Sequence, residues 1–166
     1  MDFSSIFITV IIFVTIHVGG NVISAVVCPQ AFERHGDHCY KVSGIQASWA
    51  EAKAYCQAMG GDLARITHSN VQTYIAGLIF RNLDKVRNQR FWVDGSDMLE
   101  SRVWRWMRTN GKYIPFSFTN WNPGEPNNIY EMCVEVRHEW DSRWNDEECH
   151  IRLSFICQAG LRIAMK

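Results

Sequence analysis

The sequence predicts an α+β domain that is secreted and crosslinked by disulfides. Two segments with helical periodicity lie in the first half of the chain, and short strand-like segments dominate the second half. Six cysteines follow an apolar N-terminal segment. The length of 166 residues suits a single domain of this kind.

The N-terminal segment has the composition of a secretory signal peptide. The run from Ile6 to Val18 consists mainly of apolar and small residues without Lys or Arg, and small residues follow it up to Ala25. An uncleaved transmembrane anchor is the alternative, but the run is shorter than the roughly 20 residues that span a bilayer. We therefore predict a signal peptide over residues 1–25, cleaved between Gly20 and Ala25, and a secreted, extracellular protein without membrane insertion afterwards.

The cysteine count predicts disulfides. An even number of cysteines in an oxidising compartment indicates three disulfides and no free thiol, although spacing alone does not choose among the possible pairings. A zinc site is disfavoured, because the chain has no CxxC pair and His150 stands alone beside one cysteine. The cysteines are Cys28, Cys39, Cys56, Cys133, Cys149 and Cys157.

Two helices are predicted from capping signals and periodicity. Ser48 followed by Glu51 forms a capping box, and Gly60 and Gly61 end the helix that it opens. A second helix begins at Ser69. The apolar positions at helical spacing are Trp49, Ala52, Cys56 and Met59 in the first helix, and Val71, Tyr74, Ile75, Leu78 and Ile79 in the second.

Short strands are predicted around one long irregular segment. The chain from Cys28 to Val42 is read as a hairpin that turns at Gly36. Residues Pro115 to Tyr130 are rich in Asn, Pro, Gly and aromatics without periodicity, and such long loops in compact domains are usually functional. The other strand-like segments are Phe91–Val93, the stretch with Trp104 and Trp106 on one face, Cys133–Val136 and Ser154–Cys157.

The charge balance gives no reason to expect nucleic acid or an anionic membrane as a partner. The chain carries 17 Lys and Arg against 17 Asp and Glu, and it has no basic run. Lys85, Arg87 and Arg90 form a small basic patch that we expect to be solvated.

Oxygen-bearing side chains gather in two short motifs near the C-terminal cysteines. Carboxylate and amide oxygens are the ligands that Ca²⁺ takes, and five side chains plus a backbone carbonyl leave about two positions for outside oxygens such as sugar hydroxyls. The same side chains can also hydrogen-bond those hydroxyls. Ordinary turn chemistry is the alternative for the first motif alone. The candidate calcium and carbohydrate ligands are Glu125, Asn127, Glu131, Asn145 and Asp146.

The region from Cys28 to Cys157 resembles the C-type lectin domain in its long form. The resemblance implies the double-loop fold for a domain over residues 28–158, with 159–166 as a short tail. It places the five candidate ligands at the family's principal calcium and sugar site and implies a cis Pro126. The implied pairings are Cys28–Cys39, Cys56–Cys157 and Cys133–Cys149. The matching motifs are the helix with Trp49, Glu51, Ala52 and Cys56, GGDLA (60–64), FWVDG (91–95), GEPNN (124–128), CVEV (133–136), WND (144–146) and FIC (155–157).

Within that family, the Glu-Pro-Asn version of the motif is associated with binding of mannose, fucose and N-acetylglucosamine. The Gln-Pro-Asp version is associated with binding of galactose. Many members hold a second, auxiliary calcium with an acidic residue at the position of Met132, so we expect one calcium here. Asn128 stands where an Asp is common, and Ser101 falls near a position that is often acidic, although Asp97 matches an auxiliary ligand.

We therefore expect a calcium-dependent lectin of mannose-type specificity, with innate immune glycan recognition as its candidate role and a homo-oligomer as its candidate assembly. The alternative is a secreted relative that binds a protein or mineral surface, and an enzyme is a distant third. Ile129 and Tyr130 are candidates for direct ligand contact, and His138, Glu139 and Arg143 could shape selectivity. The tryptophans are expected in the core.

Overall fold

A computed structural model of the chain describes residues 25–107 and 111–164. The predicted signal peptide lies almost entirely outside the described residues. Within them, no helix is long and apolar enough to cross a membrane. The elements are β1 (Val26–Val27), β2 (Glu33–His35), β3 (His38–Ala47), α1 (Trp49–Ala58), β4 (Asp62–Leu63), α2 (Ser69–Phe80), η1 (Leu83–Lys85), β5 (Arg90–Ser96), β6 (Arg105–Met107), β7 (Tyr113–Pro115), β8 (Cys133–Arg137), η2 (His138–Trp140), β9 (Arg143–Glu147), β10 (Leu153–Gly160) and β11 (Arg162–Ile163).

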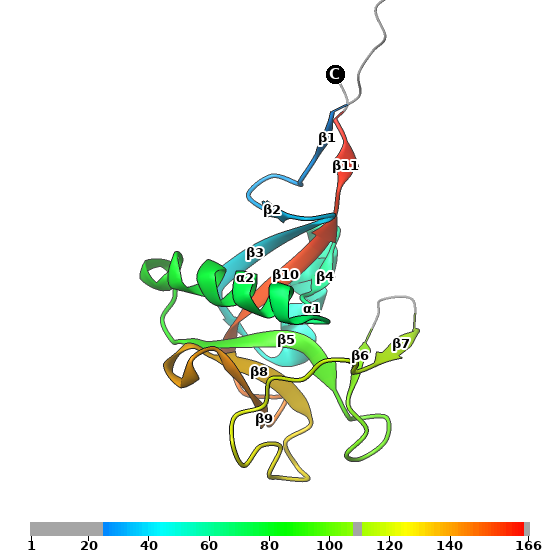
Figure 1. Cartoon of the computed structure of the whole chain (residues 1–166), viewed down its shortest axis with the longest axis vertical. Coiled ribbons are helices and arrows are strands. Elements are labelled where there is room, and N and C mark those ends of the chain that lie inside the picture. The colour runs from blue at the N-terminus through cyan, green and yellow to red at the C-terminus, as the bar shows by residue number, and fades with distance from the viewer. Residues whose placement is uncertain (1–24, 108–110, 165–166) are drawn as a thin grey trace, which may run out of the picture.

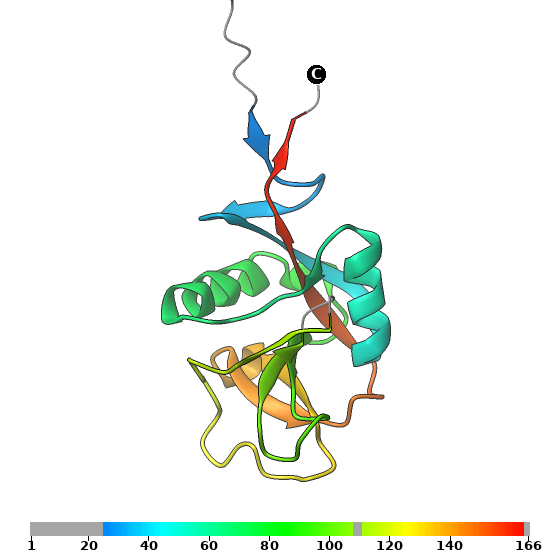
Figure 2. The ribbon, with the colours of Figure 1, turned by 90° about the vertical axis from the view of Figure 1, so that its right-hand side faces the viewer.

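The strands form one large sheet and a separate two-stranded ribbon. The path through the large sheet is β2-β3-β10-β5-β6-β7, with β4 beside β10 and the β8–β9 pair beside β5. The ribbon of β1 and β11 projects from one end of the molecule, and the irregular segment after β7 lies at the opposite end (Figures 1 and 2). The double-loop α+β fold predicted from the sequence is confirmed in its two helices, antiparallel strand pairs and three disulfides.

The two helices flank the sheet and close a core on each side of it (Figure 2). The predicted capping box is present: the Ser48 side chain accepts from the Glu51 backbone N–H, and the Glu51 side chain accepts from Ser48. Helix α1 buries Trp49, Ala52 and Cys56 in one core cluster. Helix α2 places its buried apolar residues in a second cluster, which also contains Trp106 and Trp144.

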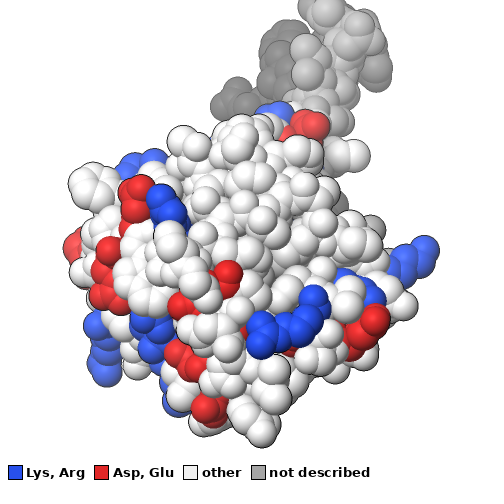
Figure 3. All heavy atoms as spheres, turned by 60° about the horizontal axis from the view of Figure 1, so that its bottom comes forward, with Lys and Arg blue, Asp and Glu red and all other residues white. Residues whose placement is uncertain are grey.

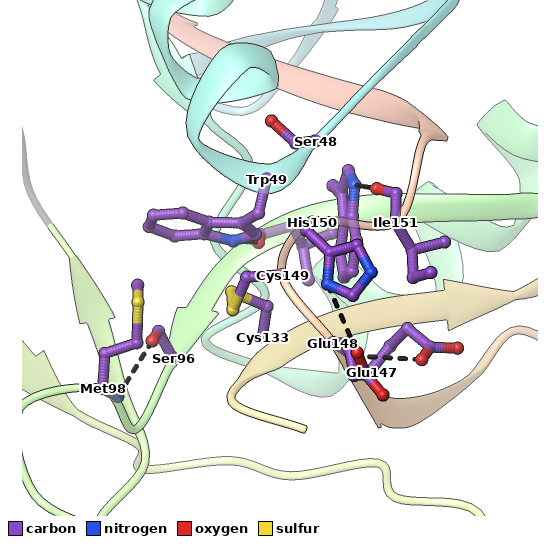
Figure 4. Close-up of a disulfide and its surroundings, with 12 residues drawn as sticks. Ser48, Trp49, Ser96, Met98, Cys133, Glu147, Glu148, Cys149, His150 and Ile151 are labelled. Atoms are coloured by element: carbon purple, nitrogen blue, oxygen red, sulfur yellow. Dashed lines mark hydrogen bonds and ion pairs between the residues drawn. A yellow bond between two sulfur atoms is a disulfide. The ribbon is translucent and has the colours of Figure 1, made fainter. Parts of the chain in front are cut away.

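Three disulfides tie the ends of these elements together. The pairs are Cys28–Cys39, Cys56–Cys157 and Cys133–Cys149, which are the pairs implied by the family resemblance. With all six cysteines paired, a cysteine zinc site is excluded. The Cys133–Cys149 bond joins the start of β8 to the segment after β9 and lies beside Trp49, whose backbone N–H donates to the Cys149 carbonyl at 2.9 Å (Figure 4).

Several element boundaries differ from the prediction. The strand expected over Phe91–Val93 extends over all of β5, because its far end pairs with β6 and β8. Trp104 precedes β6 rather than lying in it with Trp106, and it packs against the core from outside the strand. The WND motif forms part of β9, which the sequence analysis did not predict as a strand. The hairpin at Gly36 is confirmed, with His35 paired to His38.

Candidate functional site

The long irregular segment is attached to β9 by its own backbone. The Asn122 N–H donates to the Trp144 carbonyl at 2.9 Å, and the Trp144 N–H donates to the Asn120 carbonyl at 2.9 Å. Trp121 and Trp144 also form a parallel bridge. These bonds place the GEPNN motif beside the WND motif, so the two groups of candidate ligands meet although many residues separate them in the chain.

Asp146 anchors the GEPNN motif. Its carboxylate is fully buried, and its two oxygens accept from the backbone N–H groups of Asn127 and Asn128, each at 3.2 Å. A carboxylate can accept about four hydrogen bonds or metal contacts through its lone pairs. After both backbone bonds, Asp146 therefore still has acceptor capacity for a cation or another donor.

Glu125 is held close to Asp146. The Glu125–Pro126 peptide bond is cis in the structure. Burial raises the pKa of Glu125, a side-chain hydrogen bond with Asp146 and the negative charges of Asp146 and Glu131 raise it further, and Arg137 lowers it. The Glu125 Oε2 atom is buried and has no hydrogen-bond partner among the described residues. A buried carboxylate oxygen without a donor, next to a second carboxylate, is an arrangement that a hard cation such as Ca²⁺ fits.

Glu131 lies at the edge of the same group of charges. Its Oε1 accepts from the Asn128 side-chain amide at 3.2 Å. Burial raises the pKa of Glu131, and the negative charges of Glu147, Asp146 and Glu148 add to this, while the Asn128 hydrogen bond lowers the pKa. Glu131 therefore interacts electrostatically with the residues around Asp146.

Asn145 is buried between the two strands, where it is paired with Glu135 of β8. Its Nδ2 donates to the Glu135 Oε1 at 2.8 Å. Glu135 is fully buried and is also bound by Arg90 and Arg137. The expectation that Arg90 is solvated is wrong, because its guanidinium reaches across the sheet to this carboxylate.

The structure thus brings together Glu125, Asp146 and the Asn127 backbone. The charge of Glu131 interacts with Asp146, and Asn145 precedes Asp146 in β9. Across residues 25–107 and 111–164, no group of three or more His, Cys, Asp or Glu side chains is arranged to hold a metal ion by itself. A cation here would depend on the amide oxygens of Asn127 and Asn145 as well as on the carboxylates. Of these two side chains, Asn127 is exposed and Asn145 is buried.

Asp97, which the family resemblance matched to an auxiliary calcium ligand, is already engaged by the backbone. Asp97 is buried, and its Oδ2 accepts from the Arg102 backbone N–H at 2.8 Å. The Arg102 guanidinium donates to the Pro126 carbonyl at 3.0 Å. Met132 and Ile129 line a small cavity of about 150 Å³ beside Asp97. Apolar side chains therefore stand beside the acidic residues Asp97 and Glu100 around this cavity, and Arg102 lies close by.

The tryptophans lie in or against the core, and the two residues proposed for ligand contact are exposed, as the sequence analysis predicted. Trp106 and Trp144 are fully buried, and Trp104 and Trp121 pack against them. Tyr130 is 72% exposed and Ile129 is 56% exposed, so both are free to contact a ligand. Figure 3 brings forward the end of the molecule that carries the irregular segment after β7. Acidic and basic side chains are interspersed there around a large uncharged area.

Comparison with known proteins identifies the family of the chain. The model of the lectin C-type domain matches residues 45–159, well over half of the chain. The galactose-specific lectin nattectin of Thalassophryne nattereri is 30% identical over 81% of this chain and 81% of its own.

Two solved structures share the fold. A calcium-independent type II antifreeze protein superposes with a TM-score of 0.69 at 29% identity, covering 83% of this chain and 98% of its own. The C-type lectin domain of murine dendritic cell inhibitory receptor 2, in complex with an N-glycan, gives a TM-score of 0.66 at 28% identity, covering 80% and 98%. None of these comparisons indicates an enzyme family. Because the family model covers well over half of the chain, the protein belongs to the C-type lectin domain family.

Proposed function

We propose that this protein is a secreted, calcium-dependent lectin that binds sugars of the mannose type. The observation that carries the proposal is the contact between GEPNN and WND. It buries the Glu125 Oε2 atom without a donor next to the carboxylate of Asp146. The electrostatic cost of two adjacent carboxylates is offset when a divalent cation lies between them.

The five candidate ligands have distinct parts in this site. Asp146 holds the GEPNN backbone and keeps acceptor capacity for the ion, and Glu125 offers its unpartnered oxygen. Asn127 and Asn145 add amide oxygens, and Glu131 adds a third carboxylate. A bound Ca²⁺ would supply about two further positions that vicinal sugar hydroxyls can fill. Glu125 and Glu131 can accept hydrogen bonds from those hydroxyls, and Asn127 can donate to them.

Mannose-type specificity is proposed on the Glu-Pro-Asn motif at residues 125–127. The relative nattectin is named galactose-specific, so the test must compare both sugars. The N-glycan complex of the murine receptor supports a carbohydrate ligand for this fold.

The experiment is chromatography of the mature protein on immobilised mannose in calcium-containing buffer. We expect retention, release by a chelator, and elution by free mannose at lower concentration than by free galactose. The matched control is Asn82→Ala, which removes a side-chain bond to the Leu78 carbonyl of α2, outside the GEPNN and WND segments. Asn127→Ala should abolish retention while the control keeps it. Equal or better elution by galactose would refute the specificity.

The second candidate function is calcium-independent binding to a protein or mineral surface. The antifreeze protein that shares the fold is calcium-independent. In this chain, the exposed apolar side chains of Met98, Leu99, Ile129 and Met132 surround the small cavity beside Asp97. Binding that survives the chelator would favour this function over the first.

A further inference from the structure

The side chain of Asn145 is held by a buried ionic network that neither the family comparison nor the proposed function accounts for. Glu135 is fully buried. Arg90 donates two parallel hydrogen bonds to it, from Nε to Oε2 at 2.7 Å and from Nη2 to Oε1 at 2.8 Å. Arg137 Nε donates to Oε1 at 2.7 Å. Bidentate arginine–carboxylate pairs of this kind fix the orientation of both partners.

A second carboxylate also belongs to the network. Glu147 contacts Arg90 and lies 3.7 Å from Arg137. Burial lowers the pKa of Arg90, but hydrogen bonds and charge attraction to Glu135 and Glu147 outweigh this and raise the pKa overall. Two guanidinium groups thus face Glu135 and Glu147, and Arg137 also lies 3.9 Å from the exposed Glu139.

This network determines which end of the Asn145 amide faces Glu135. A carboxylate only accepts hydrogen bonds, and an amide oxygen pointed at it would repel it. The Nδ2 group must therefore face Glu135, as it does at 2.8 Å. The amide oxygen is then directed away from Glu135, and no described residue donates to it. A free amide would rotate between two orientations, only one of which presents oxygen to a cation.

We propose that Glu135 is a positioning residue, which fixes the Asn145 amide with its oxygen turned toward the candidate calcium site. The inference rests on the proposed function for the identity of the cation. Residues that orient a metal ligand typically change metal affinity about 10–100-fold when they are removed. Glu135 is fully buried, so its direct contact with the candidate ligands is the hydrogen bond to Asn145.

The matched pair of variants is Glu135→Gln and Glu147→Gln. Both remove one negative charge from the same two arginines, but only Glu135 contacts Asn145. Calcium affinity is measured by calorimetry for each variant. We expect Glu135→Gln to weaken calcium binding at least about tenfold and Glu147→Gln to weaken it clearly less. Equal weakening by the two variants would show that only charge matters and would overturn the inference.

A second measurement reads the Asn145 amide directly, without calcium. In NMR spectra of the wild-type protein, the Asn145 side-chain N–H protons should exchange with water at least about tenfold more slowly than those of exposed Asn127. Glu135→Gln should remove this protection, and Glu147→Gln should keep it. Equal exchange of Asn145 and Asn127 in the wild type overturns the inference even if Glu135→Gln does not fold. A protected amide in a protein that binds no calcium would count against the proposed function and not against orientation by Glu135.

Discussion

Acid should release the sugar by displacing calcium, and the candidate site predicts how the midpoint of that release depends on calcium concentration. Calcium requires deprotonated carboxylates, so protons and calcium compete. The pKa values of Glu125 and Glu131 are both raised in the folded protein. A raised pKa means that protonation begins above the ordinary glutamate range of about 4.3. Calcium affinity is therefore complete at pH values above these raised pKa values and is lost as the pH falls through them.

The number of competing carboxyls sets the size of the shift. If calcium displaces one proton, a tenfold increase in calcium moves the midpoint down by about 1 pH unit, and if it displaces two, by about 0.5 pH unit. Two raised glutamates predict about 0.5 pH unit per tenfold change. Glu131→Gln leaves one of these glutamates. The shift of the midpoint per tenfold change in calcium concentration should then rise toward about 1 pH unit.

The assay is a titration of mannose binding from neutral pH downward at two calcium concentrations, with circular dichroism at each pH to follow the fold. We expect the midpoint to move to lower pH at the higher calcium concentration. A midpoint that stays in place would refute competition at these carboxylates. Loss of binding that coincides with loss of the circular dichroism signal would assign the release to unfolding.

Three further predictions concern the fold and the specificity. Replacing Cys133 and Cys149 by Ala opens a crosslink with a sequence separation of 16. This double substitution should lower the free energy of unfolding, measured in urea titrations, by about 3 kcal/mol. A loss of less than about 1 kcal/mol would contradict the chain-entropy estimate. Gly95→Ala would place a methyl carbon 2.5 Å from the Val134 side chain of β8. The clash should lower the free energy of unfolding by about 1–3 kcal/mol. An unchanged denaturation midpoint would show that β8 moves aside without a loss of stability. Glu125→Gln combined with Asn127→Asp should reverse the ratio of mannose to galactose inhibition by about tenfold or more, equivalent to about 1.4 kcal/mol, and an unchanged ratio would place specificity elsewhere.

The fold was largely predictable because its signals are local or carried by ordered motifs. The capping box at Ser48 and Glu51 depends on four consecutive residues, and it forms as predicted. The hairpin at Gly36 depends on one turn. The disulfide pairings did not follow from spacing, and only the family resemblance supplied them.

Strand β9 was missed for a physical reason. Trp144, Asn145 and Asp146 are all buried, so the strand lacks the alternation of apolar and polar residues that identifies a half-buried strand. Without β9, its pairing with β8 was not available to the sequence analysis. The contact between Asn145 and Glu135 follows from that pairing.

The candidate ligands were found from their residue types, but their environment was not. Arg90 was expected in solvent as part of a basic patch with Lys85 and Arg87, and its partner lies 45 residues further along the chain. Nothing local signals such a pair. A buried strand that carries Glu in its centre, as CVEV does, was the one available indication that a cation must lie opposite.

The central claim is that the GEPNN and WND motifs hold one calcium ion, and calorimetric titration of calcium into the mature protein tests it most directly. The expected result is one site per chain, with no heat of binding after Glu125→Gln and Asp146→Asn are combined. Either no calcium binding in the wild type or two sites of similar affinity would contradict the account.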